Sequence, residues 1–85
     1  MIRHVAVKIG DVVHSLPKPN RHRNIYDMLP NLPKQSGFIV GGVDGFLDAK
    51  GRFLTREQAL DYAISVGQIK EPQWDENKLF SEDLW

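Results

Sequence analysis

The sequence predicts a single α+β domain over residues 1–85, in which two β-hairpins form a small antiparallel sheet and two helices pack on it. Three observations lead to this fold class. Apolar and polar residues alternate over 4–9, as in a half-buried strand. A capping box at 55–58 precedes residues with helical spacing. The order strand, turn, strand, cap, helix occurs twice, at 4–29 and at 45–66, and we expect both helices on one side of the sheet.

The first unit begins with the strand 4–9. Gly10-Asp11 is a two-residue turn candidate, and residues 12–16 return as the second strand, which Pro17 ends because proline cannot donate to the ladder. Asn20 is the expected N-cap of a helix over 21–29. The expected apolar face of this helix consists of His22, Ile25, Met28 and Leu29.

The second unit is a hairpin over 45–54 followed by the best-specified helix of the chain. The turn Asp48 to Gly51 has glycine where a left-handed residue is needed. Thr55 is the expected N-cap, and Gly67 ends the helix. Its expected buried residues are Ala59, Leu60, Ala63, Ile64 and Val66.

Three further segments complete the chain. Residues 34–45 contain four glycines and read as a loop with a short strand at 38–40; they are either a flexible connector or a place of close backbone approach. Residues 70–78 are polar and irregular. The closing residues 79–85 are rich in large apolar side chains, so we expect them to dock on the body of the protein.

Composition excludes several classes of protein. The chain has no cysteine, no apolar run long enough to span a bilayer and no secretory signal, which predicts a cytosolic location and no membrane partner. A formal net charge of zero argues against DNA or RNA as the main partner. No motif predicts a metal site or a cofactor. A thin core, open hairpin edges and an apolar tail favour a homodimer.

Charge is unevenly distributed along the chain. Residues 1–35 carry six Lys/Arg and two Asp/Glu, whereas residues 36–85 carry five and nine. The basic half peaks at 18–23, a cluster whose size suits one or two phosphates rather than a polyanion. The sequence therefore predicts a small, anionic, nucleotide-like ligand.

The candidate ligand site is the first turn of the 21–29 helix. Basic side chains there oppose the helix dipole unless an anion is bound, although Arg21 and Arg23 can also be solvated and His22 can be a core histidine. Arg52 and Arg56 are candidates for a second charged clamp, or they are exposed to solvent or paired with Asp48 or Asp61. The expected ligand-binding residues are Lys18, Arg21, His22, Asn24, Arg52 and Arg56. If the protein is an enzyme, His22 with His14 is the candidate acid/base pair.

Three segments carry a resemblance to a known family. They are Arg21-His22-x-Asn24, the run from Gly45-Phe46-Leu47 through Gly51-Arg52-Phe53 and Arg56-Glu57 to Gly67-Gln68-Ile69, and the closing 79–85. In these segments the chain resembles a family of small proteins of tailed bacteriophages and prophages. The family pattern favours Asp where this chain has Asn24. The resemblance implies a phage protein that counters host defence through a nucleotide immune signal, such as a cyclic dinucleotide (CBASS) or a cyclic ADP-ribose isomer (Thoeris).

Three functions follow from these observations. The first is a binding protein that sequesters such a nucleotide signal. The second is a metal-independent phosphodiesterase that cleaves it. The third is an inhibitor that binds a host protein through Trp74, Phe80 and Trp85.

Overall fold

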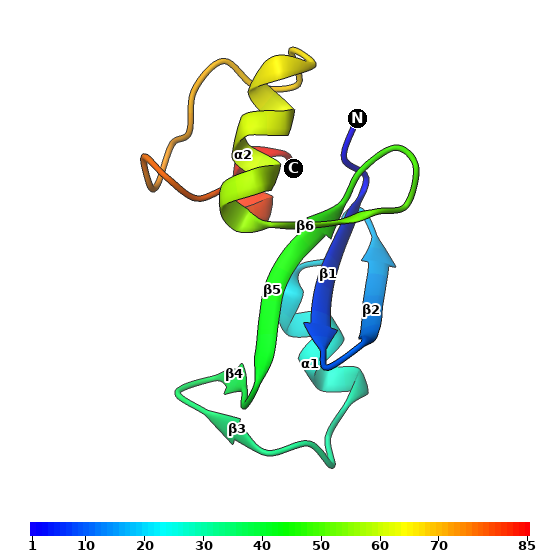
Figure 1. Ribbon diagram of the computed structural model, residues 1–85. Helices are drawn as coiled ribbons and strands as arrows, with labels where there is room; N and C mark the ends of the chain where they lie inside the picture. The colour runs from blue at the N-terminus through cyan, green and yellow to red at the C-terminus, as the bar shows by residue number, and fades with distance from the viewer.

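A computed structural model describes residues 1–85 and confirms an α+β fold. The strands β1, β2, β5 and β6 form one antiparallel sheet in the order β2-β1-β5-β6, and β3 and β4 form a separate two-stranded ribbon (Figure 1). The elements are β1 (His4–Ile9), β2 (Val12–Pro17), α1 (His22–Met28), β3 (Lys34–Gln35), β4 (Phe38–Ile39), β5 (Gly42–Leu47), β6 (Phe53–Thr55), α2 (Arg56–Ser65) and the 3-10 turn η1 (Ser81–Asp83).

The sheet joins the two predicted hairpins through β1. The β1–β2 hairpin turns at Gly10 and Asp11, as expected, and β1 also pairs along its whole length with β5, from His4↔Leu47 to Ile9↔Gly42. The second hairpin turns through 48–51, where the Gly51 N–H donates to the Asp48 carbonyl oxygen and Gly51 has a φ of 80°. The start of β1 therefore lies beside the end of β5.

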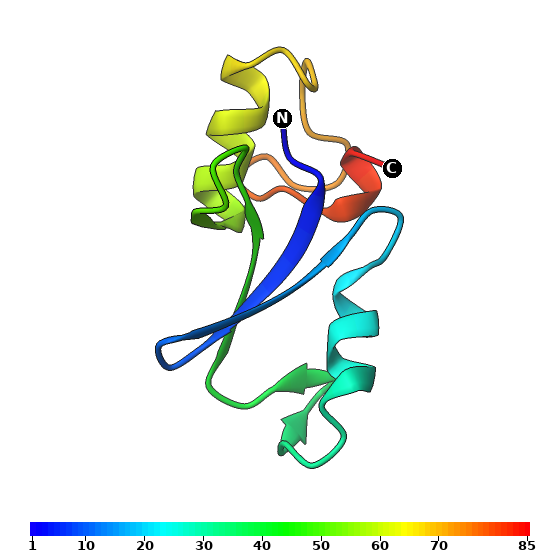
Figure 2. The ribbon, with the colours of Figure 1, turned by 90° about the vertical axis from the view of Figure 1, so that its right-hand side faces the viewer.

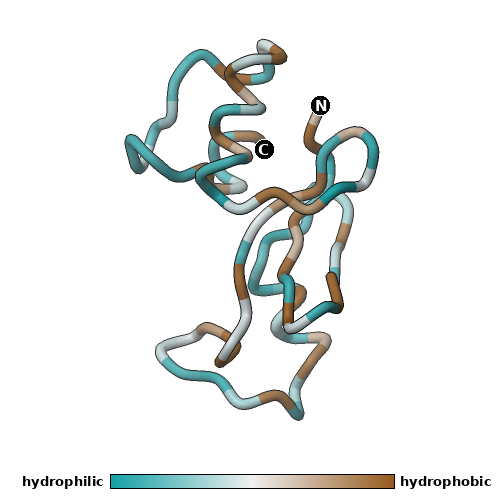
Figure 3. The backbone as a smooth tube through the Cα atoms, viewed as in Figure 1, coloured by the Kyte–Doolittle hydropathy of each residue, from teal (hydrophilic) through white to brown (hydrophobic).

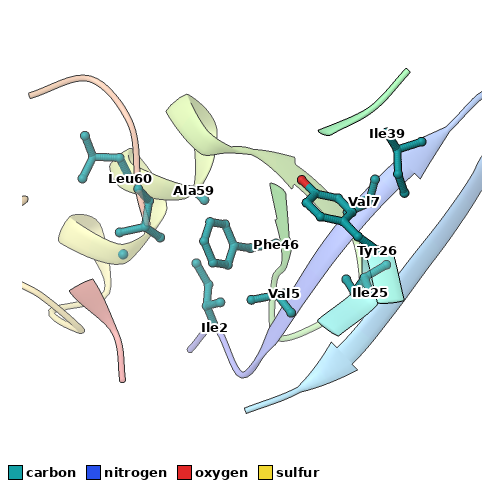
Figure 4. Packing of buried hydrophobic residues seen from close by; sticks show 11 residues of the cluster. Ile2, Val5, Val7, Ile25, Tyr26, Ile39, Phe46, Ala59 and Leu60 are labelled. Atoms are coloured by element: carbon teal, nitrogen blue, oxygen red, sulfur yellow. The ribbon is translucent and has the colours of Figure 1, made fainter. Parts of the chain in front are cut away.

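The two helices occupy different positions on this sheet. α1 packs on β1 and β2, whereas α2 packs on β5 and β6. Viewed from the side, α1 covers the lower part of one face and α2 stands at the upper end (Figure 2). Both contribute to one core (Figure 4). Its buried members are Ile2, Val5, Val7, Ile25, Tyr26, Ile39, Phe46, Ala59, Leu60, Ala63 and Leu79.

The cap of α1 differs from the sequence prediction. Arg21, in extended conformation, is the N-cap, and Asn20 lies one residue too early for that role. The Arg21 backbone N–H donates to Asn24 Oδ1 at 2.7 Å, while Asn20 Nδ2 donates to the Pro17 carbonyl oxygen. Asn24 is thus used to start the helix, and the Met28 expected on the apolar face is half exposed, at the rim of a groove that it shares with Ile9 and Val12.

The ends of α2 agree with the prediction. Thr55 and Gln58 form the capping box, with Gln58 N–H donating to Thr55 Oγ1 at 3.2 Å. At the other end, Gly67 has a φ of 74° and the Gln68 N–H donates to the Ala63 carbonyl oxygen at 2.8 Å, a Schellman motif. Ile64 and Val66 are exposed rather than buried, because no element covers that face of the helix beyond Ala63.

The glycine-rich segment is more ordered than a loop. It contains the β3–β4 ribbon and the first four residues of β5. Its close backbone approach is to the chain itself: a Cβ on Gly45 would meet the Leu54 carbonyl oxygen and lie 2.6 Å from Cζ of Phe53. Gly45 is therefore needed for β5 and β6 to pair.

The C-terminal residues dock on the body, as predicted. The segment between α2 and the tail is mostly hydrophilic (Figure 3). The tail then returns, with Leu79 fully buried and its N–H donating to the Arg56 carbonyl oxygen at 3.0 Å. Trp85 Nε1 donates to the Asn20 carbonyl oxygen at 3.0 Å, so the last residue is held against the start of the first helix.

Candidate functional site

The first cluster of functional candidates lies where the C-terminal tail meets the start of α1. Arg21 Nη1 donates to Ser81 Oγ at 3.1 Å and lies 3.9 Å from Glu82 Oε1. Ser81 is buried, and its hydroxyl donates to Glu82 Oε1 at 3.0 Å. Two of the sequence motifs, Arg21-His22 and Ser81-Glu82, therefore contact each other, although the side chains of Arg21 and Glu82 stay partly exposed to solvent.

Arg56 connects three elements at this junction. Its Nη1 donates to the Leu79 carbonyl oxygen at 2.8 Å, and its Nη2 donates to Asp44 Oδ2 at 3.2 Å. The guanidinium also lies 4.5 Å from the centre of the Phe80 ring. The side chains of Arg56 and Asp44 are only 15% and 12% exposed. This ion pair therefore links β5, α2 and the tail in an environment that water screens little.

Tyr26 completes the Asp44 site. Its hydroxyl donates to Asp44 Oδ1. Burial, reinforced by this hydrogen bond to a carboxylate, raises the pKa of Tyr26 above its usual value. The phenol is thus kept neutral, and both oxygens of the Asp44 carboxylate have a partner.

His22 is a core residue. Its imidazole is 7% exposed, Nε2 donates to the Gly45 carbonyl oxygen at 2.7 Å, and the ring meets that of Phe46 edge-on at 5.1 Å. Burial, with the nearby Arg56 charge, lowers the pKa of His22. The ring is accordingly neutral at pH 7 and satisfied within the chain.

His14 is not brought to His22. It lines a groove beside Met28, at the opposite end of α1 from His22. The remaining residues of this groove are Ile9, Val12, Leu29, Pro30, Asn31 and Leu32. The geometry therefore gives no support to the two imidazoles acting as an acid/base pair.

The aromatic residues of the inhibitor hypothesis have different surroundings. Trp74 is 69% exposed, but Phe80 lies under Arg56 and Trp85 is bonded to Asn20. Two of the three thus serve the docking of the tail.

A second cluster surrounds a pocket of about 470 Å³ at the end of the sheet where β1 begins and β5 ends. Strand pairing places His4 opposite Leu47 there. The pocket is lined by Met1, Arg3, His4, Leu47, Asp48, Ala49 and Gly51. Its volume is within the range of small-molecule sites.

The charge of the Asp48 carboxylate, in the wall of this pocket, is balanced by hydrogen-bond donors of the chain. Its carboxylate is buried and accepts from the backbone N–H of Arg52 at 2.9 Å, from the N–H of Lys50 at 2.8 Å and from Arg52 Nε at 2.7 Å. These hydrogen bonds, that of the Arg52 backbone first, lower the pKa of Asp48. The carboxylate organises the turn and does not leave a free negative charge in the pocket.

The other charged groups around the pocket are basic. Arg3 lines it, Lys50 lies in the turn between Ala49 and Gly51, and the Lys18 N–H donates to the Arg3 carbonyl oxygen at 2.7 Å. The side chains of Arg3, Lys18 and Lys50 are in no ion pair within the chain. Arg3 and His4 line the pocket, and Lys50 and Arg52 are chain neighbours of its lining residues; we call these four residues the basic pocket. Of the predicted ligand residues, Arg52 belongs to it and Lys18 lies next to it through the backbone of Arg3, whereas Arg21, His22, Asn24 and Arg56 all lie in the first cluster.

Sequence reasoning did not single out Arg3 or His4. Neither belongs to a motif, and they reach the turn at 48–51 only because β1 pairs with β5, more than thirty residues away. The only feature of the sequence that included Arg3 was the excess of basic over acidic residues in 1–35.

The comparisons identify a family. A family model described as Phage T4 y16D protein matches residues 1–85. The chain belongs to this family. A family of small phage proteins was the expectation from the motifs, and the match to the phage T4 y16D protein family covers the whole chain. No curated protein and no solved structure matches it.

Two further findings concern what the residues can hold. No group of three or more His, Asp or Glu side chains is gathered closely enough to bind a metal ion. Neither helix combines the length and the apolar character that crossing a bilayer requires.

Proposed function

We propose that this phage-family protein binds a small phosphorylated, nucleotide-like anion in the basic pocket and holds it without cleaving it. The observations that carry the proposal are two cations without an ion-pair partner: Arg3, which lines the pocket, and Lys50, which lies in the turn between two lining residues. The only carboxylate of the lining, Asp48, is already paired with Arg52. Cationic side chains that lack a partner form charge-assisted hydrogen bonds with phosphate oxygens. Arg52 adds to the field, since its Nη groups remain outside the bond to Asp48.

Binding is favoured over cleavage by the surroundings of the histidines. His4 is the only imidazole in the pocket lining, and its ring has no hydrogen-bond partner in the chain that would orient it as a base. General acid/base cleavage of a phosphodiester uses side chains that are positioned within hydrogen-bond reach of the protons they transfer. The neutral His22 is committed to Gly45 in the core.

The biological role that we propose is the sequestration of a host nucleotide immune signal, a cyclic dinucleotide or a cyclic ADP-ribose isomer. Membership of a phage family supports the setting. A pocket at the end of a small sheet needs only to bind such a signal more tightly than its host receptor does.

The experiment is a calorimetric titration of the protein with cyclic dinucleotides, cyclic ADP-ribose isomers and inorganic phosphate. We expect Arg3→Gln and Lys50→Gln each to weaken binding by about tenfold, because each removes one charge-assisted contact at an exposed site. Arg23→Gln is the matched control, since Arg23 is an exposed arginine of α1 outside the basic pocket. Equal affinities in all three variants, or no binding by the wild type, would contradict the proposal.

A second measurement separates binding from cleavage. The protein is incubated with the ligand that it retains, denatured by heat, and the small molecule recovered. Intact ligand supports sequestration, whereas a hydrolysed product would show an enzyme and overturn the binding-only reading.

A further inference from the structure

The strand β2 is an open edge of the sheet. It is one of the two outer strands, six residues long, and its sequence Val12-Val13-His14-Ser15-Leu16-Pro17 contains no Lys, Asp or Glu. In Figure 2, which views the sheet from this side, no helix or other strand stands in front of it. Val12 and Val13 are 56% and 39% exposed. Soluble proteins usually protect so long an edge with charges or bulges, and β2 has neither.

The hairpin geometry fixes which backbone groups of β2 point outward. Ile9 and Val12 close a two-residue loop, so they form a hydrogen-bonded pair, and such pairs alternate along an antiparallel ladder. His14 and Leu16 therefore bond inward to β1, and Val13 and Ser15 direct their N–H and C=O groups outward. Pro17 falls at an outward position, where its missing N–H removes no bond to β1.

We propose that β2 pairs antiparallel with β2 of a second copy of this chain, about a two-fold axis at His14, to give one continuous eight-stranded sheet. In this register Val13 is opposite Ser15 of the second copy, and the reverse pair is equivalent. The outward groups of these two pairs form four backbone hydrogen bonds. His14 then faces His14 of the second copy in a non-hydrogen-bonded pair, with Cα atoms about 4.5 Å apart.

Side chains and charges fit this register. Val12 is opposite Leu16 of the second copy, which buries an apolar pair at each end of the interface. Asp11, opposite Pro17 of the second copy, is one residue from its Lys18, so an Asp–Lys contact forms at both ends. Neighbouring registers that centre on Val13 or Ser15 lose outward backbone bonds to Asp11 in the turn or to Pro17.

The helices fit as well. Because α1 packs on both β1 and β2, the two copies of α1 lie on the same face and are separated by roughly two strand spacings, about 10 Å. That is the distance at which helices pack. Met28, half exposed and beside Val12 in the groove, is on the side that faces the second copy.

The assembly closes at two chains. A two-fold axis uses both β2 edges at once. The other edge of each sheet is β6, only three residues long and too short to continue the pairing.

The test uses His14→Cys in the full-length chain, which otherwise has no cysteine. We expect mild oxidation to give a disulfide-linked dimer, because opposed Cα atoms about 4.5 Å apart fit disulfide geometry. Val13→Cys is the matched control on the adjacent residue. Its copies are about 7–8 Å apart on the diagonal, so we expect little cross-linking.

Sedimentation of protein that has not been cross-linked measures the mass of the assembly independently. We expect twice the chain mass for the wild type and one chain mass for Val13→Lys, a substitution at an exposed side chain that places charge on the edge. The proposal is overturned if the wild type sediments as a monomer at high micromolar concentration. It is equally overturned if His14→Cys cross-links no faster than Val13→Cys.

Discussion

At the scale of single residues, the side chains that looked most functional hold the protein together. Arg21 and Arg56 bind the tail, and His22 binds the backbone of β5. Asp48, one of the expected partners of Arg52, does pair with it and fixes the wall of the basic pocket. Charge in a sequence therefore does not by itself indicate a ligand, because a partner far along the chain can neutralise it.

Gly45 gives the sharpest prediction at this scale. We expect Gly45→Ala to destabilise the protein by about 1–3 kcal/mol or more, because the new methyl group overlaps the Leu54 carbonyl oxygen and the Phe53 ring. Gly42→Ala is the control: its nearest contacts, Ile39 O and Val7 Cγ1, are both at 3.2 Å, so small shifts relieve them. Urea denaturation measures both. Equal losses in the two variants would contradict the close approach.

At the scale of elements, the tail acts as a third packing layer. Leu79 completes the core, Arg56 donates to its carbonyl oxygen, and Trp85 donates to the carbonyl oxygen of Asn20, two residues before α1. The Gln68 side chain holds Ile2, two residues before β1, in a similar way, accepting from the Ile2 N–H at 2.7 Å and donating to its C=O at 2.9 Å. Both ends of the chain are thus fastened by side chains that belong to its motifs.

The ion pair between Asp44 and Arg56 can be tested with a double-mutant cycle. We expect Arg56→Met to lower the free energy of unfolding by about 3 kcal/mol, since it leaves a mostly buried carboxylate without its cation. Asp44→Asn combined with Arg56→Met should recover part of that loss, because the asparagine carbonyl can still accept from Tyr26. The measurement is thermal and urea unfolding of Arg56→Met, Asp44→Asn and the double variant. Additive effects of the two substitutions would argue against coupling.

At the scale of the whole molecule, stability depends on pH through a few buried groups. The pKa of His22 is lowered in the folded protein, so the unfolded chain takes up a proton first as the pH falls. The contribution of neutral His22 is complete above the ordinary histidine pKa of about 6.5 and is lost as the pH falls below it. Asp48, whose pKa is also lowered, contributes above about pH 4 and loses its contribution only in stronger acid.

The pH ranges in which His22 and Asp48 contribute to stability lead to a prediction. The free energy of unfolding of the wild type should fall between pH 7 and pH 5, and His22→Gln should flatten that part of the curve, because glutamine can donate to Gly45 without titrating. Asp48→Asn should change the curve only near pH 4 and below. Chemical denaturation across this pH range is the measurement. An unchanged slope in His22→Gln would show that other groups cause the loss.

The sequence by itself determined the local elements, because their signals are local. Alternation over 4–9, the turn at 10–11, the Thr55–Gln58 capping box and the Gly67 stop each depend on residues within a few positions of one another. It also determined the docking of the tail, since so many large apolar residues cannot remain in water, and the motifs pointed to a phage family.

Only the tertiary structure decided which charged residues are free. Arg21 meets Ser81, Arg56 meets Asp44 and Leu79, and Arg3 comes to the turn at 48–51 through strands and contacts that join distant positions. No local pattern encodes those pairings, because they depend on strand order and on the path of the tail. The candidate anion site therefore moved from the first turn of α1 to the pocket beside the turn at 48–51, where Arg3 and Lys50 have no ion-pair partner.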